Sequence, residues 1–285
     1  MRISDMIVDV HSHAMRYPEH LSDSFVREAD IARGFHIDLT IEFDAYMRVM
    51  EPVDRCIVFG MKARHVGFYV PNDWIAAFAA QAPEKIIPFM SLDPTEPDFL
   101  DDFEHSYFDL KLKGIKLAPM YANFDPTDPK LDELYRRAAK YGLPILFHAG
   151  TTFCQFAPLK YTRPALWDEV AMRHPDTKMI LAHLGHPFEN EALVTTRKHP
   201  NVYLDLSALY YRPWQLYNSL ILAQEYKVIP KILFGSDFPF ATPGDSITGL
   251  YALNKMVEGT NLPRVSEAGL EEIIHRDSLT LLGLK

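Results

Sequence analysis

The chain has 285 residues, of which 48% are hydrophobic, 24% charged and 12% aromatic, a balance that excludes a disordered, collagen-like or coiled-coil protein. Because 29 Lys and Arg face 38 Asp and Glu, the net charge is −9, which argues against nucleic acid as a partner, since binding a phosphate backbone needs a basic face. Two cysteines are too few for a disulfide framework, and neither a signal peptide nor an apolar run of about 18 residues is visible, so we expect a cytoplasmic protein that does not enter a membrane.

Short apolar runs with high β-propensity recur along the chain. Most are continuously apolar, as in VDRCIVFG and LPILFHAG, a pattern typical of strands that are buried on both faces of a parallel sheet. In chain order, strands are predicted over residues 6–13, 55–61, 86–93, 114–120, 143–150, 178–185, 202–208 and 232–239.

Segments with helical spacing of apolar residues separate these strands. Asp73 is placed to cap one of them, Pro164 suits a first helical turn, and Gly142 after Tyr141 is a typical helix end. In chain order, helices are predicted over residues 41–50, 74–82, 99–112, 131–141, 164–174, 188–198, 213–228 and 246–258.

Eight βα units without an intervening linker predict an α/β fold, a single (β/α)₈ TIM barrel domain over residues 1–285. The alternative, an open doubly wound sheet, usually has about five or six strands. Residues 14–38 are polar and are predicted to form a long irregular loop over one end of the barrel. Residues 266–282 are predicted to form a closing C-terminal helix.

Potential metal ligands gather where the predicted strands end, which is the functional end of a parallel barrel. His11 and His13 alternate at the end of the first strand, so both face the barrel axis, and His148 and Asp237 end the fifth and eighth strands. Three imidazoles and a carboxylate suit one divalent ion, first Zn²⁺ but also Mn²⁺, Fe²⁺ or Co²⁺. Without a metal, the same residues would be a buried histidine pair, a core histidine and a loop acid.

Two of the strand-end residues are candidates for proton transfer. His183, after the sixth strand, can exchange a proton with a metal-activated water or with the substrate, or it can be a further ligand or a support for one. Asp237 can both bind the metal and accept the proton of the attacking water, and its alternative role is a helix cap or a loop ion pair.

Lys116 interrupts an apolar strand, and burying a lysine is costly unless it is paired or functional. An ion pair, a substrate contact and a carbamate bridging a second metal are all open. Other candidates for contact with a small anionic substrate follow strand ends, each with a structural or surface role as its alternative: Arg16, His65, Tyr121, Arg163, His186 and Tyr210. Dinucleotide, phosphate-loop and serine-hydrolase motifs are absent.

The motifs DVHSH, GIKL, LFHAG, LAHLGHP and LFGSDFP are similar to those of the amidohydrolase superfamily, in particular the amidohydrolase-related branch that includes aminocarboxymuconate-semialdehyde decarboxylase. The resemblance implies a metal held by His11, His13, His148 and Asp237, with His183 beside the reacting group. Binuclear relatives carry a carboxylated lysine on the strand of Lys116. The same pattern also accompanies a single metal in this branch, so we expect one ion and no carbamate.

Three functions remain open at this point. The first is a metal-dependent hydrolase that cleaves an amide, ester or lactone bond in a small carboxylated or cyclic compound through a metal-activated water. The second is a non-hydrolytic, metal-dependent decarboxylase, in which an arginine of a rim loop would clamp the carboxylate. The third is a barrel that binds a ligand without catalysis. A homodimer is expected from the resemblance alone.

Overall fold

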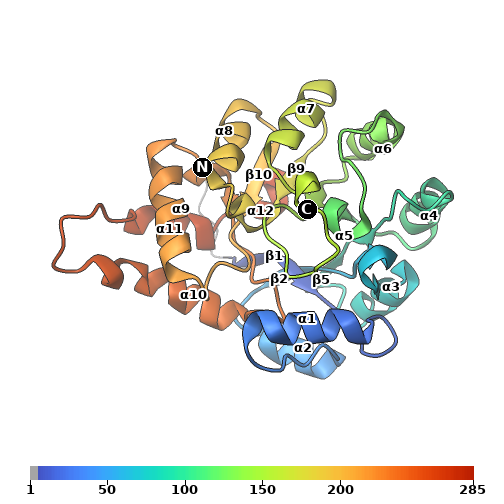
Figure 1. The fold of residues 1–285 in the computed structure, drawn as a ribbon, viewed down its shortest axis with the longest axis horizontal. Coiled ribbons are helices and arrows are strands. Elements are labelled where there is room, and N and C mark those ends of the chain that lie inside the picture. The colour runs from blue at the N-terminus through green and yellow to red at the C-terminus, as the bar shows by residue number, and fades with distance from the viewer. Residues whose placement is uncertain (1–5) are drawn as a thin grey trace.

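Eight parallel strands close into a barrel within residues 6–285, the part of the chain that this computed structural model describes (Figure 1). In barrel order they are β1 (Val8–His13), β2 (Arg55–Phe59), β5 (Ile86–Pro88) continued by β6 (Met90–Ser91), β7 (Ile115–Leu117), β8 (Ile145–Phe147), β9 (Met179–Leu181), β10 (Val202–Asp205) and β11 (Ile232–Leu233).

The last strand returns to the first and so closes the barrel. The amide of Val10 donates to the carbonyl of Phe234 over 2.9 Å, and the amide of Asp237 donates to the carbonyl of His11 over 2.8 Å. Ser12 and Phe238 also form a parallel bridge. The predicted (β/α)₈ barrel is thus confirmed.

The helices surround the strands, as Figure 1 shows. They are α2 (Phe43–Val49), α3 (Asn72–Ala79), α4 (Phe99–Glu104), α6 (Asp132–Tyr141), α7 (Ala165–Arg173), α8 (Glu189–Lys198), α9 (Pro213–Glu225) and α10 (Pro243–Ala252). In α6, Leu134, Tyr135 and Ala138 are buried at helical spacing, and Gly142 ends the helix with φ +68°, where glycine is favoured. A short helix, α5 (Pro119–Ala122), follows β7.

The prediction of an irregular loop over residues 14–38 was wrong, because this excursion contains the helix α1 (Asp23–Arg33). The side chain of Ser22 caps its first turn by accepting from the amide of Phe25 over 3.3 Å. Phe25 and Ala29 are buried at a spacing of four residues, and this short apolar face is what the polar composition obscured. Figure 1 shows α1 beside α2 at one edge of the barrel.

Several predicted elements are shorter than the sequence pattern indicated. Residues 266–282 form two helices, α11 (Glu267–Ile274) and α12 (Ser278–Leu282), because Asp277 starts a new helix by capping the amide of Thr280. Residues 99–112 divide into α4 and a π-helical turn, His105–Asp109. The strand predicted over 178–185 ends at Leu181, and a 3₁₀ turn follows it, Ala182–Gly185.

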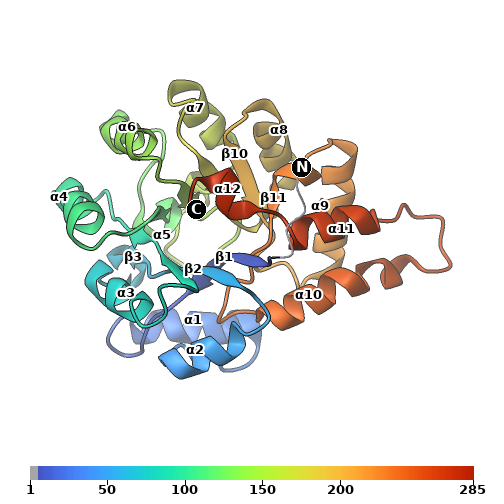
Figure 2. The same ribbon diagram turned by 180° about the vertical axis from the view of Figure 1, so that it is seen from behind.

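Apolar side chains fill the barrel interior below the strand ends. Val8, Val10 and Phe89 belong to this cluster, as do Leu279 and Leu282 of α12. Figure 2 shows α12 over the middle of the barrel. This packing occupies the end where the strands begin, which leaves the opposite end for a binding site. No helix among residues 6–285 combines the length and apolar character that crossing a membrane requires.

Candidate metal centre

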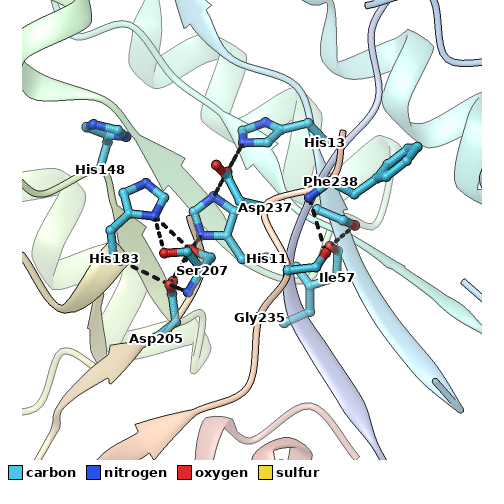
Figure 3. Close-up of polar contacts among 12 residues, drawn as sticks. His11, His13, Ile57, His148, His183, Asp205, Ser207, Gly235, Asp237 and Phe238 are labelled. Carbon is cyan, nitrogen blue, oxygen red and sulfur yellow. Dashed lines mark hydrogen bonds and ion pairs between the residues drawn. The ribbon is translucent and has the colours of Figure 1, made fainter. Parts of the chain in front are cut away.

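Three side chains from the two ends of the chain converge at the C-terminal end of the barrel (Figure 3). The Nε2 atoms of His11 and His13 lie 3.3 Å apart. Oδ1 of Asp237 is 3.2 Å from Nε2 of His11 and 3.4 Å from Nε2 of His13. Asp9, in the same strand, lies outside this group, and its Oδ2 accepts from the hydroxyl of Ser236 over 2.6 Å.

Asp237 is held in place by its backbone. Its φ is +66°, in the left-handed region that aspartate tolerates better than most residues, and its amide donates to the carbonyl of His11. The eighth strand therefore ends in a turn that places this carboxylate directly against the histidines of the first strand.

His183 has the same kind of support on the other side of the centre. It lies in the turn after β9 with φ +59°. Its Nδ1 lies 2.7 Å from the hydroxyl oxygen of Ser207 and 3.1 Å from the carbonyl oxygen of the same residue. Because that hydroxyl donates its proton to Asp205 and a carbonyl only accepts, Nδ1 carries the proton. The Nε2 atom of the neutral ring is then a lone-pair donor. The ring centroids of His183 and His11 are 4.9 Å apart.

Asp205, at the end of β10, positions His11 and the backbone of His183. It was not among the residues predicted from the sequence. Its Oδ2 lies 2.9 Å from Nδ1 of His11, and its Oδ1 accepts from the amides of His183 and Ser207, each over 3.0 Å. The side chain is fully buried, and the neighbouring His11 holds its pKa below the usual range despite the opposing effect of burial. The sequence feature that could have indicated this residue is the single acid within the apolar run VYLDLSA.

The donor set fits a divalent metal. His11, His183 and Asp237 each offer one ligand atom, and these atoms lie within 4.8 Å of one another. Asp205 fixes the Nδ1–H tautomer of His11, so Nε2 faces the centre with its lone pair, as in a carboxylate–histidine–metal arrangement. Nδ1 of His13 is buried and has no hydrogen-bond partner within residues 6–285.

His148 lies beside this group and not inside it. Its Nε2 is 3.0 Å from the carbonyl oxygen of Thr151, so that nitrogen carries a proton, and its ring centroid is 4.9 Å from that of His183. The atoms grouped by mutual distance are those of His11, His183 and Asp237. The role of His148 as a metal ligand stays a prediction.

Burial keeps the imidazoles of His13, His148 and His183 neutral, which is the form that binds metals. It lowers the pKa of His13 to about 4 and that of His183 to about 3, and it lowers the pKa of His148 as well. For His11, burial acts to lower the pKa, but Asp205 and Asp237 raise it above its usual value. Burial opposes the ionisation of Asp237, yet the neighbouring His11 and His13 hold its pKa well below the usual range.

Lys116 is fully buried near these residues and forms no ion pair within residues 6–285. Its Nζ has no hydrogen-bond partner among them and lies 4.7 Å from the centroid of the Phe59 ring. Burial lowers its pKa to about 8. Of the three interpretations of this lysine, the ion pair is not found.

A cavity of about 450 Å³ opens onto the centre, and His13, His148, His183 and Asp237 all line it. Helix α1 contributes Phe25, Glu28 and Arg33 to its wall, so the excursion after β1 shapes the binding space. Tyr121, expected at the substrate, also lines the cavity.

The other residues expected at the substrate do not line this cavity. Arg16 pairs with Glu42 at 2.7 Å, and Arg163 pairs with Glu191. His65 bonds to the carbonyl of Phe156, and the hydroxyl of Tyr210 donates to the carbonyl of Gly235. His186 is buried, and neither ring nitrogen has a hydrogen-bond partner among the described residues.

Replacing Asp205 by asparagine is expected to weaken metal binding by about 10- to 100-fold, the usual effect of removing a carboxylate that orients a ligand histidine. The amide retains the shape but loses the charge that stabilises the His11 tautomer. Competition with a chelator of known affinity measures the change. Asp168→Asn, which alters an acid paired with Lys198 outside the barrel, is the control. Equal affinity in both variants would contradict the role given to Asp205.

The buried ring of His186 is expected to make the stability of the fold depend on pH within a defined range. Burial, with Arg212 nearby, lowers its pKa to about 4, so the unfolded chain binds more protons than the folded one between about pH 6.5 and 4. The contribution of the neutral ring to the free energy of unfolding is fully present above about pH 6.5. It is lost as the pH falls from there to below about 4, which lowers the free energy of unfolding by about 3 kcal/mol. Thermal unfolding of His186→Gln should show a smaller loss on acidification than wild type, and the exposed-residue variant His65→Gln should follow wild type.

Comparisons with known proteins agree with the architecture. A dihydroxybenzoic acid decarboxylase from Polaromonas sp. JS666, solved with bound manganese and 2-nitroresorcinol, is 16% identical, with a TM-score of 0.66 and coverage of 98% of this chain and 97% of that one. A 2,6-dihydroxybenzoate decarboxylase solved with its 2,6-dihydroxybenzoate ligand is 18% identical, with a TM-score of 0.69 and coverage of 98% and 99%.

A third solved structure, a probable 2-pyrone-4,6-dicarboxylic acid hydrolase from Acinetobacter baumannii with citric acid bound, is 13% identical, with a TM-score of 0.69 and coverage of 97% and 99%. A search of the curated proteins finds no match. The sequence model of the amidohydrolase family matches residues 8–275, nearly the whole barrel. The chain therefore belongs to the amidohydrolase family.

Proposed function

We propose that this enzyme is a metal-dependent hydrolase of a small carboxylated or cyclic compound, with an amide, ester or lactone bond as its target. The proposal rests mainly on the convergence of His11, His13, His183 and Asp237. Three of them, His13, His183 and Asp237, line one cavity. The bound manganese of the dihydroxybenzoic acid decarboxylase supports a divalent ion at such a site. We propose a single ion, Zn²⁺ first, with Lys116 uncarboxylated.

A divalent ion held by these residues would lower the pKa of a bound water and polarise a carbonyl. The chain itself supplies proton acceptors. Asp237 is ionised, because His11 and His13 keep its pKa low, and His183 is neutral with a free Nε2 lone pair. These two groups can take the proton of an attacking water and pass it to the leaving group. The apolar side chains Phe25 and Phe153 restrict access of bulk water.

Decarboxylation is the second candidate, and the 2,6-dihydroxybenzoate decarboxylase with its bound ligand favours it. That reaction needs a group that delivers a proton to carbon. Burial lowers the pKa of His183, so its neutral ring would first have to gain a proton before it could deliver one to carbon. The hydrolase among the similar structures supports hydrolysis.

The test is metal analysis of the purified protein followed by a panel of lactones, amides and aromatic carboxylates in water enriched in ¹⁸O. We expect about one divalent ion per chain, label incorporated into the product, and no release of CO₂. Release of CO₂ without incorporation of label would overturn hydrolysis in favour of decarboxylation. Absence of both metal and turnover would reject a metal-dependent enzyme.

A further inference from the structure

We infer that residues 31–36, the end of helix α1 and the turn after it, form a lid at the mouth of the cavity. Stacking of Arg33 on Tyr211 is the latch that holds this lid closed. Opening admits the substrate, and closure keeps bulk water out of the cavity. The inference concerns access to the cavity, so it goes beyond the proposed function and holds for any reaction at the metal centre.

The first half of α1 is fixed to the barrel through a neighbouring hairpin, β3 and β4, which covers residues 62–69. The amide of Ser22 donates to the carbonyl of Gly67 over 2.8 Å. Phe25 is buried, and its ring centroid lies 4.9 Å from that of Phe68. Backbone and side-chain contacts together therefore hold the start of this helix in place.

Asp30 closes the base of the lid. Its Oδ1 accepts from the amide of Ile37 over 3.0 Å, and Ile37 is buried. Further along, the amide of Ile41 donates to the carbonyl of Met15 over 2.9 Å. The chain thus leaves the fixed part of the fold and returns to it at points that a hydrogen bond joins, with residues 31–36 between them.

The lid itself has little burial to hold it in place. None of residues 31–36 is buried, and the side chains of Ile31 and Phe35 are 73% and 58% exposed. Ile31, Ala32 and Arg33 nevertheless line the cavity. An apolar side chain that lines a cavity and remains so exposed lies at its mouth. Segments with few buried contacts open at low cost in free energy, so this part of the wall is the one suited to move.

The latch joins the lid to the loop between β10 and α9. Cζ of Arg33 lies 3.7 Å from the ring centroid of Tyr211 and 5.3 Å from that of Phe35, and its Nη1 has no hydrogen-bond partner among residues 6–285. Tyr211 also lines the cavity. The other side of the latch is firm, because Arg212 packs 4.5 Å from the Tyr211 centroid and donates to the carbonyl of Ala208 over 3.0 Å. One cation–π contact therefore closes the lid.

Access to the cavity can be measured through His148, which lines it. Diethyl pyrocarbonate is applied to the full-length, chelator-treated protein, and peptide mass spectrometry gives the rate at which His148 is carbethoxylated. We expect Tyr211→Ala and Arg33→Gln each to raise this rate by about 3- to 10-fold, because either change removes the latch. Tyr211→Phe retains the ring and should match wild type. The exposed His105, outside the cavity lining, is the internal reference.

Hydrogen exchange follows the lid directly. The amide of Gly34 donates to the carbonyl of Asp30 over 2.8 Å. A helix as short as α1 is marginal in water without packing, so release of its end should speed exchange at Gly34 by the same factor. Amides of α6 should exchange as in wild type. The double variant Arg33→Gln/Tyr211→Ala should be no faster than either single variant, because both changes remove one contact.

Unchanged carbethoxylation of His148 in Tyr211→Ala would overturn the lid. Acceleration by Tyr211→Phe equal to that by Tyr211→Ala, or additive effects of the two substitutions, would overturn the latch. Faster exchange in α6 by the same factor as at Gly34 would assign the effect to the whole fold and would also reject the lid. Because the protein is treated with a chelator, none of these results depends on the metal chemistry of the proposed function.

Discussion

Replacing Asp237 by asparagine is expected to lower turnover of the substrate by about 10³-fold. Asparagine retains the size of the side chain and tolerates the left-handed φ of +66°, so the turn after β11 should persist. What disappears is the negative charge that lies 3.2 Å from His11 and 3.4 Å from His13. The variant loses a proton acceptor and an anionic ligand in one step. Steady-state kinetics and metal content of the same preparation measure both effects.

Asp245→Asn is the matched control for that substitution. Asp245 lies in the first turn of α10, after the same strand, and its carboxylate bonds to the hydroxyl of Thr242 outside the centre. Its replacement should leave turnover and metal content unchanged. An Asp237→Asn protein with wild-type turnover would contradict both roles proposed for Asp237.

The barrel was predictable because most of its strands are continuous apolar runs, and burial on both faces leaves few other structures for such runs. Strand ends were less predictable. The run KMILAHLG continues past Leu181, yet the chain turns at Ala182 and places His183 at φ +59°. That turn depends on contacts of His183 with Asp205 and Ser207 from the next strand, and one sequence does not contain those distances.

The candidate site was predictable to the extent that strand ends of a parallel barrel share one rim. This rule brought His11, His13 and Asp237 together, and they lie within hydrogen-bond distance of one another or close to it. The rule does not predict how each imidazole ring is oriented. The ring of His148 is oriented by its hydrogen bond to the carbonyl of Thr151, which lies in the loop that follows it. The position of Arg33 in the cavity wall could not be predicted for another reason. It depends on helix α1, which the polar composition of residues 14–38 did not indicate.

Replacing His183 by asparagine separates its support of the turn from its chemistry. Asparagine adopts left-handed backbone more readily than most residues, and its amide can donate to the carbonyl of Ser207 as Nδ1–H does in the wild type. The Nε2 lone pair has no equivalent in the variant. We expect kcat to fall by about 10²- to 10⁴-fold while KM changes little, because a group that moves a proton in the transition state is lost and no ground-state contact is removed.

Metal content distinguishes the two roles that the geometry leaves to His183, since its Nε2 can accept a proton or bind the ion. His11, His13 and Asp237 remain in His183→Asn, so a proton-transfer role predicts metal content equal to that of wild type together with the loss in kcat. A parallel loss of metal would identify His183 as a ligand and would leave His148, whose ring lies 4.9 Å away, as the remaining histidine for proton transfer. His174→Asn, which alters a histidine paired with Asp132 outside the barrel, should change neither quantity.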